Sequence, residues 1–278
     1  MEIIETAEAM RAWSFRQKRL GKTIGFVPTM GALHEGHISL MRAAVQGNDL
    51  GVASIFVNPT QFAPNEDFSK YPRTFEGDVR MCTEAGIQAI YAPTGDSMYP
   101  AGYSTYVTVE NVSEGLCSRT RPHFFRGVAT VVTKLFNAVL PDRAYFGQKD
   151  AQQCAVIKRM ARDLDMGIDI IEMPIIREPD GLAMSSRNRY LGPEDRQRAL
   201  CLSRSLFQAE KMLQAGERSA AVLIQAVREG MDAVNIDYVE LVDADSMQPV
   251  DRVEQPVVLA VAALVGPARL IDNIKYIL

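Results

Sequence analysis

The chain has 278 residues, 47% of them apolar, which is enough to bury a large core as one domain or as a main domain with a smaller one. A formal net charge of −4 gives no general attraction to nucleic acid or to an anionic membrane, so neither is expected as a partner. No segment resembles a secretory leader or reaches the roughly 18 apolar residues of a membrane span, which predicts a cytoplasmic protein. The four cysteines lack paired spacing, which favours reduced thiols.

Short apolar runs rich in β-branched residues alternate with helical patterns through the first two thirds of the chain. Strands are expected over 23–27, 51–57, 89–92, 106–109, 143–146 and 168–171. Such alternation predicts an α/β fold with a Rossmann-like, doubly wound parallel sheet. Ligands of such sheets bind at the carboxyl ends of strands, and the polar clusters 28–37 and 58–62 each follow an expected strand. We therefore expect both clusters to open onto one crevice.

The pattern changes towards the C-terminus and predicts a smaller α+β domain. Helices are expected over 193–216 and 219–233, and strands over 236–242, 257–265 and 268–273, with Gly266 and Pro267 as a turn. This part contains no histidine, and its charges are spread along helix faces, which is typical of solvated surface. The predicted division is a main domain over 1–185 and a smaller C-terminal domain over 186–278.

Two of the three histidines, His34 and His37, lie within one helical turn, directly after an apolar run that ends near Gly31. A strand that leads into a helix would point both imidazoles one way at the helix N-terminus, which favours anions. Gly36 lets a ligand approach the backbone between the rings. The pattern favours the binding of a phosphate. Taken alone, however, the motif fits equally well two surface histidines without a role. A zinc site lacks further ligands at the usual spacing.

Two later clusters carry cations in turn-like contexts. Lys149 and Asp150 follow a strand-like run that breaks at Gly147, and they could neutralise phosphate and accept hydrogen bonds from ribose. A solvated pair on a turn is the alternative. Residues 180–190 combine a turn signal with two serines and two arginines, which suits a polyphosphate and a loop that closes over it. A helix capped by one serine, with solvated arginines, explains the same string.

Amide and basic clusters complete the set of candidate binding residues. The amides within 58–61 and 152–153 suit the hydroxyl and carboxylate groups of a small polar substrate, although exposed glutamine is ordinary. The arginines of 119–126 surround His123 and form a basic patch in an acidic protein, where a carboxylate or phosphate could bind.

Taken together, these strings resemble the pantothenate synthetase (pantoate–β-alanine ligase) family of the HxGH nucleotidyltransferase superfamily. The motifs occur in the order and spacing of that family, and the resemblance extends through 270–273, so it covers essentially the whole chain. The segments that carry it are 28–37 (PTMGALHEGH), 56–62 (FVNPTQF), 71–74 (YPRT), 146–150 (FGQKD) with 152–153 (QQ), and 180–190 (DGLAMSSRNRY).

The resemblance implies a homodimeric cytoplasmic ligase whose nucleotide-binding fold is shared with class I aminoacyl-tRNA synthetases. Such an enzyme condenses (R)-pantoate with β-alanine to pantothenate through pantoyl adenylate, releasing AMP and pyrophosphate, with Mg²⁺ accompanying ATP. Residues 1–185 would bind nucleotide and pantoate, and 186–278 would cover the active site. The alternatives are an adenylyltransferase of the same superfamily and a nucleotide-binding regulatory protein without catalysis. Paired Gln61 and Gln153 and the whole-length match favour the ligase.

The resemblance also implies roles for individual residues. His34, His37 and Lys149 would be catalytic, Gln61 and Gln153 would bind pantoate, Gln61 would also meet β-alanine, and Asp78 would be a magnesium-associated carboxylate. The segment 184–187 would correspond to the mobile KMSKS loop of the synthetases. The implied ATP-binding residues are Met30, Gly31, Ala32, Leu33, His34, Glu35, Gly36, His37, Gly147, Gln148, Lys149, Asp150, Ile176, Met184, Ser185, Ser186 and Arg187.

The sequence departs from the usual family pattern in three places. Gln148 stands where a glutamate is common, which removes a charge beside the lysine. His123 and Phe124 stand where the common string has glycine and histidine, and Cys117 stands where many members have glutamate. The last two departures fall where the family is thought to admit β-alanine.

Overall fold

The computed structural model describes residues 1–62 and 68–278, which divide into two compact units. Unit 1 comprises Met1–Val109, Arg121–Gly147 and Val156–Met173. Unit 2 comprises Glu110–Thr120, Gln148–Ala155 and Pro174–Leu278. No helix in the described part of the chain is both long enough and apolar enough to cross a membrane.

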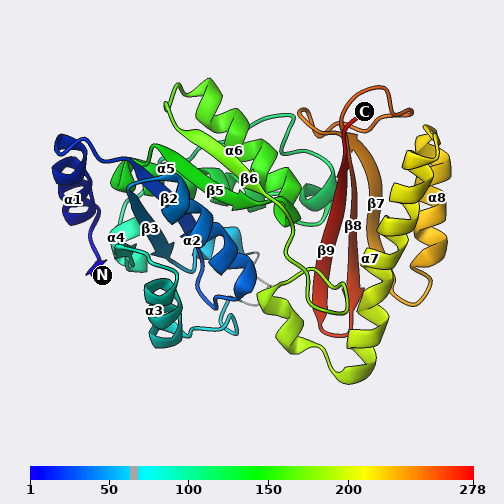
Figure 1. The fold of residues 1–278 in the computed structure, drawn as a ribbon, viewed down its shortest axis with the longest axis horizontal. Helices are drawn as coiled ribbons and strands as arrows, with labels where there is room; N and C mark the ends of the chain where they lie inside the picture. Colours follow the sequence, from blue (N-terminus) through cyan, green and yellow to red (C-terminus); the bar gives the residue numbers. More distant parts are fainter. Residues whose placement is uncertain (63–67) are drawn as a thin grey trace. The chain divides into compact units, whose positions relative to one another are not determined.

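Unit 1 is built on a six-stranded parallel sheet with the order β1-β4-β3-β2-β5-β6, which confirms the predicted doubly wound fold (Figure 1). The strand order changes direction at β2, because β3 lies on one side of it and β5 on the other. Ligands of doubly wound sheets bind beside such a switch point, outside the carboxyl ends of the strands. The strands are β1 (Glu2–Ile4), β2 (Ile24–Thr29), β3 (Leu50–Ile55), β4 (Ala89–Tyr91), β5 (Arg143–Gly147) and β6 (Asp169–Met173).

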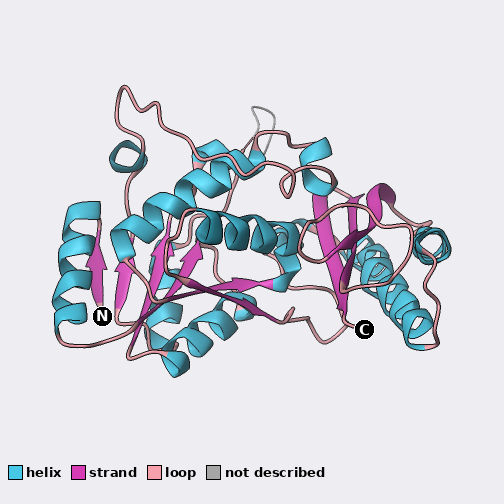
Figure 2. Cartoon of the chain, turned by 90° about the horizontal axis from the view of Figure 1, so that it is seen from above, coloured by secondary structure: helices cyan, strands magenta, loops and turns pink. Residues whose placement is uncertain are grey.

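Helices cover both faces of this sheet (Figure 2). Successive side chains of β2 point to opposite faces: Val27 belongs to the apolar cluster shared with α2 and α3, whereas Phe26 meets Phe136 of α5 edge to face. The cluster around Val27 therefore fixes the position of α2, the helix that carries the histidine pair. The helical elements are α1 (Ala7–Arg19), α2 (Glu35–Gly47), η1 (Pro59–Gln61), α3 (Phe75–Glu84), α4 (Gly95–Met98), α5 (Phe124–Val139) and α6 (Ala151–Asp163), which begins in unit 2 and ends in unit 1.

In unit 1, one strand prediction was wrong and one strand was missed. The expected strand at 106–109 is extended but belongs to neither sheet of the described residues, although Val107 donates its backbone N–H to Thr130 Oγ1 of α5. The β-branched alternation there predicts extended backbone, but a strand also needs a partner. The edge strand β1 was missed because three residues are too few for a periodicity to appear.

Unit 2 contains a three-stranded antiparallel sheet in the order β7-β8-β9, which confirms the predicted α+β character of the C-terminal part. Gly266, with a φ of 55°, closes the turn between β8 and β9 as predicted. Apolar residues of α7 and α8 share one core with the sheet. The elements are η2 (Leu116–Arg119), η3 (Gln148–Asp150), η4 (Ser186–Tyr190), α7 (Pro193–Gln214), α8 (Ala220–Gly230), β7 (Asn235–Asp243), β8 (Val257–Val265) and β9 (Ala268–Tyr276).

The division by contacts differs from the predicted boundary between 185 and 186. Residues 174–185 group with the C-terminal sheet, and so do two earlier segments, Glu110–Thr120 and Gln148–Ala155. Hydrogen bonds explain the grouping, since Arg119 pairs with Glu240 of β7 and the amide of Asn273 in β9 bonds to Gln148. Such contacts join residues more than a hundred positions apart, so local sequence patterns do not reveal them.

Candidate active site

The two predicted catalytic histidines lie at the N-terminus of α2, next to the carboxyl end of β2. His34 is the N-cap residue, and its Nδ1 accepts the backbone N–H of Gly36 at 3.2 Å. The Nδ1 of His37 accepts the backbone N–H of His34 at 3.3 Å, and the two ring centroids are 4.1 Å apart. Because each Nδ1 is an acceptor, each neutral ring carries its proton on Nε2 and is a hydrogen-bond donor there. The pair thus caps its own helix and presents donors that suit phosphate oxygens.

Asp78 of α3 holds the loop between β2 and α2. Its carboxylate is buried and accepts the backbone N–H groups of Ala32 and Leu33 at 3.0 and 2.9 Å, as well as the Thr74 hydroxyl at 3.1 Å. The loop needs this support because Gly31 and Ala32 have positive φ values of 81° and 50°. These hydrogen bonds favour a positioning role over the predicted magnesium-associated one. The described residues contain no cluster of three or more metal-ligating side chains.

Gln61 follows β3, and its side-chain amide is oriented by Asn58. Asn58 is buried and donates its amide to Gln61 Oε1 at 2.9 Å and to the Gly127 carbonyl at 3.2 Å. The hydroxyl of Tyr99 donates to Asn58 Oδ1 at 2.9 Å, and burial raises the pKa of Tyr99, which keeps this donor protonated. Since Gln61 Oε1 accepts, the Nε2 amide of Gln61 is the group that can donate to a substrate oxygen.

The basic patch around His123 is split by the structure. Arg121 donates to the backbone carbonyl of Gln61 at 2.8 Å, and its guanidinium lies 3.9 Å from the centre of the Phe124 ring. The departure at Phe124 therefore supplies an aromatic surface for Arg121. Arg126 instead stacks on Tyr106, and Arg119 belongs to unit 2, where it pairs with Glu240.

The predicted lysine turn, Gln148–Asp150, belongs to unit 2 and follows β5 directly. Lys149 Nζ lies 3.7 Å from Asp150 Oδ2, and the lysine side chain is only 21% exposed. The turn is anchored by Asn273 of β9, whose amide nitrogen donates to the carbonyls of Gln148 and Lys149 at 2.9 and 3.0 Å. The amide of Gln148 donates back to Asn273 Oδ1 at 3.2 Å.

The predicted serine–arginine loop, residues 180–190, includes η4 at its C-terminal end. Ser185 caps this short helix by accepting the backbone N–H of Arg187, so the capping alternative is realised at this serine. Asn188 donates to the Ala183 carbonyl at 3.0 Å and to Glu178 at 2.7 Å. The backbone N–H of Met184 donates to the Ile176 carbonyl at 3.0 Å, which brings two predicted ATP-binding residues together.

Charged contacts fix the base of this loop. Arg196 of α7 pairs with Glu178 and Asp180, each at 2.7 Å, and the hydrogen bond from Arg196 holds the pKa of Glu178 below its ordinary value. Arg177 forms a bidentate pair with buried Asp272 and donates to the Gly181 carbonyl at 3.1 Å. Arg196, a charge of α7 that we expected to be solvated, therefore binds this loop through partners 16 and 18 residues away. The partner of Arg177 is 95 residues away, and such spacings conceal both sets of partners from sequence patterns.

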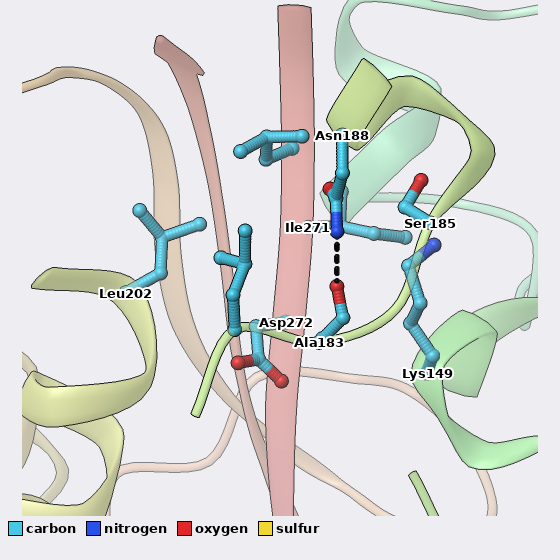
Figure 3. A pocket seen from close by; sticks show the side chains of 9 residues that line it. Lys149, Ala183, Ser185, Asn188, Leu202, Ile271 and Asp272 are labelled. Carbon is cyan, nitrogen blue, oxygen red and sulfur yellow. Dashed lines mark hydrogen bonds between the residues drawn. The ribbon is translucent and has the colours of Figure 1, made fainter. Parts of the chain in front are cut away.

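A pocket of unit 2 brings the lysine turn and the serine–arginine loop together (Figure 3). Lys149 and Ser185 lie on one side of it, and Asp272 and Leu202 on the other. Its lining residues are Lys149, Leu182, Ala183, Ser185, Asn188, Leu202, Leu270, Ile271 and Asp272.

The adjacent glutamines of α6 differ in their surroundings. Gln152 is buried, accepts the backbone N–H of Cys117 and donates to the carbonyls of Val112 and Glu114, so its amide is used within the protein. Gln153, the predicted pantoate contact, is partly exposed. Three positioning residues were not predicted as such: Asn58, Asn273 and Arg196. Asn58 was predicted only within an amide cluster that suits a substrate, and Asn273 lies in the 270–273 string that extends the family resemblance, whereas Arg196 carried no signal.

A parallel doubly wound sheet with paired imidazole donors at a helix N-terminus beside the switch point defines a nucleotide-binding α/β protein. Comparisons with known proteins identify the family of this nucleotide-binding protein. The family model of pantoate–β-alanine ligase matches residues 2–275, so the chain belongs to this family, and the resemblance predicted from its motifs is confirmed.

Named relatives and solved structures agree over the whole chain. The pantothenate synthetase of Thermotoga petrophila is 55% identical over 276 residues, covering 98% of this chain and 99% of the relative. The crystal structure of pantothenate synthetase from Thermus thermophilus is 41% identical with a TM-score of 0.93 and covers 99% of each chain. A pantoate–β-alanine ligase from Francisella tularensis, solved with β-γ ATP and β-alanine, is 31% identical with a TM-score of 0.77, covering 99% of this chain and 97% of that one.

Proposed function

We propose that this protein condenses (R)-pantoate with β-alanine to give pantothenate while ATP is converted to AMP and pyrophosphate. Membership of the ligase family supports the overall reaction, and the Francisella tularensis relative was solved with two ligands of the matching kinds. The observation that carries the proposal is the histidine pair, whose Nε2–H donors stand at a helix N-terminus beside the switch point. That geometry suits the charge that develops when an α-phosphate is attacked.

The reaction needs two steps because a carboxylate is a poor electrophile. First, a carboxylate oxygen of pantoate attacks the α-phosphorus of ATP, and pyrophosphate leaves with the electrons of the broken P–O bond. Then the amine of β-alanine attacks the carbonyl of pantoyl adenylate, AMP leaves, and the amine loses a proton. His34, His37 and Lys149 offset the negative charge of the first transition state, and Gln61 Nε2 donates to a pantoate oxygen.

The remaining assignments follow the motifs of the family. Gln153 also binds pantoate, and Gln61 lies where β-alanine arrives. Gly147 and Asp150 lie near the ribose, and the segment 28–37 lines the nucleotide. Residues of the serine–arginine loop complete the nucleotide contacts, namely Ile176, Met184, Ser185, Ser186 and Arg187. Hydrogen bonds at both ends of this loop support a defined resting shape, from which closure over ATP would start.

Mg²⁺ enters this proposal with ATP, whose phosphate oxygens are ligands of the kind that magnesium prefers. Asp78 does not fit a ligand role, because both of its oxygens accept backbone N–H groups inside the protein.

We also propose that the protein is a cytoplasmic homodimer, as the family resemblance implies. The extended segment 105–109 belongs to neither sheet of the described residues and carries β-branched residues and the exposed Tyr106, which supports an interface with a second copy. Sedimentation equilibrium at assay concentrations should give the mass of two chains, and a fully active monomer would remove this part of the proposal.

The function is tested with pantoate that carries ¹⁸O in both carboxylate oxygens. Mass spectrometry should find one ¹⁸O in AMP and one in the amide product, and AMP should require ATP, pantoate and an amine during turnover. ADP with labelled phosphate would overturn the adenylate mechanism. A stable nucleotide-linked product would instead support the adenylyltransferase alternative.

A further inference from the structure

The string at 270–273 extends the family resemblance but has no role in the proposed chemistry. In the structure, its last residue, Asn273, is 2% exposed and joins β9 to the lysine turn through three hydrogen bonds. Two run from its amide to the carbonyls of Gln148 and Lys149, and the third returns from the amide of Gln148. The backbone that carries the catalytic lysine is therefore fixed by one side chain from a distant strand.

The preceding residue, Asp272, anchors the second predicted ATP-binding segment of unit 2. It is 2% exposed and accepts two hydrogen bonds from Arg177, at 2.6 and 3.0 Å, and Arg177 in turn donates to the Gly181 carbonyl. Burial raises the pKa of Asp272, and the bonds from Arg177 oppose that rise. Two consecutive residues of β9 thus hold the lysine turn and the base of the serine–arginine loop.

We propose that Asn273 is a positioning residue for adenylate formation and acts through Lys149. This inference rests on the proposed function, because it needs Lys149 to contact the phosphates. The lysine side chain is long and flexible, so the place of its backbone decides where its ammonium group can reach. Misplacement of a catalytic group by about 1 Å can lower a rate by roughly a hundredfold.

The chemistry of the amide makes the proposal specific. Asn273 donates to two carbonyls at once, and aspartate at this position would place carboxylate oxygens against the same two acceptors. A serine could still donate one hydrogen bond, but it is too short to reach both carbonyls. Relative to its position in the wild type, the lysine turn should therefore be displaced more in Asn273→Asp than in Asn273→Ser.

The test is a double-mutant cycle on ATP–pyrophosphate exchange with pantoate present. We expect Asn273→Asp to lower kcat by roughly 10- to 100-fold and Asn273→Ser by less, with thermal unfolding close to that of the wild type for the serine variant. In the Lys149→Ala background, either change at Asn273 should alter the rate by less than about twofold, because the group being positioned is already gone.

Asn235→Asp is the matched control, since it makes the same change at an exposed position of the same sheet and should keep the wild-type rate. If the losses multiply in the double variants, Asn273 does not act through Lys149 and the inference is overturned. Should Asn273→Asp fail to fold, the serine variant completes the cycle. A wild-type protein that makes no AMP would instead refute the proposed function, and a Lys149→Ala variant with full exchange would refute the role of Lys149 on which this inference rests.

Discussion

The histidine site of unit 1 and the lysine turn of unit 2 are held in opposite ways. The imidazoles of His34 and His37 accept backbone N–H groups two and three residues away, within one helical turn. In unit 2, the backbone of Lys149 is held by Asn273, 124 residues away, and Arg177, at the base of the serine–arginine loop, is held by Asp272, 95 residues away. The first site is therefore a property of its own segment, whereas the second exists only when β9 has folded.

The largest expected effect concerns the long-range site. Lys149→Ala should lower ATP–pyrophosphate exchange by on the order of a hundredfold or more, because a charge contact to the transition state is lost. Lys211→Ala, at an exposed position of α7, is the matched control and should keep the wild-type rate. Near-normal exchange in the Lys149 variant would refute the assignment of this residue.

The histidine site gives a sharper test, because the observed capping by Nδ1 can be separated from the proposed donation by Nε2. Asparagine at position 37 keeps an acceptor near the place of Nδ1 but lacks a donor near Nε2, whereas glutamine keeps a donor near Nε2. We expect His37→Asn to retain the thermal stability of the wild type while exchange falls by on the order of a hundredfold. His37→Gln should retain more activity.

Nitrogen-15 NMR provides the direct observation on the same site. In its neutral form, each histidine should give the shifts of a ring protonated at Nε2. A δ-protonated ring at either position would contradict the capping geometry from which the donor role is inferred.

Asp78 is the one long-range support that we describe for the histidine site. It accepts the backbone N–H of Leu33, which is 45 residues away in the sequence. Asp78→Asn replaces one acceptor with a donor that faces a buried backbone N–H, so the free energy of unfolding should fall by about 2 kcal/mol. Exchange should fall as well, by roughly tenfold, because the loop before α2 loses a support.

Added Mg²⁺ separates the two roles considered for Asp78. If Asp78 positions the loop, raising Mg²⁺ leaves the activity of Asp78→Asn unchanged, whereas recovery of the rate would restore the magnesium-associated role. Asp96→Asn is a control at an exposed position of the same unit and should match the wild type in urea unfolding and in rate.

The contrast between short-range and long-range contacts also explains how much of the fold and of the site could be predicted from the sequence. Five of the six expected parallel strands formed, because apolar runs and helical periods are local signals. The strand at 106–109 failed because pairing needs a partner that the pattern does not specify. His34 and His37 could be recognised from four residues of sequence, since the helix turn alone brings them together.

The supports of the site were beyond the reach of such patterns. Asn58 is close to Gln61 in sequence, yet the Tyr99 that orients it is 41 residues away. Gly127 was unremarkable in the sequence, although a Cβ there would lie 2.3 Å from the Thr60 carbonyl oxygen. Arg196 looked like one more solvated charge on a helix, because nothing near it indicates Glu178 or Asp180 as its partners.

The smallest expected effect probes the ion pairs that hold the serine–arginine loop. The hydrogen bond from Arg196, helped by one from Asn188, holds the pKa of Glu178 below its ordinary value of 4.5. A lowered pKa means that the charged contact stabilises the fold above pH 4.5 and is lost as the pH falls through the folded-state pKa. Glu178→Gln keeps the acceptor for Asn188 but removes the charge. Because the pair is partly exposed, the variant should be less stable by under about 1 kcal/mol at pH 7.

Urea unfolding over a pH series measures this effect, and the difference between the wild type and Glu178→Gln should vanish well below pH 4.5. Glu254→Gln changes a carboxylate whose side chain is 76% exposed, and it should show no difference at any pH. A Glu178 difference that persists at acid pH would mean that shape, rather than charge, holds the loop. A difference that vanishes would mean that charge holds the loop, because Arg196 then stabilises it only while its carboxylate partner is ionised.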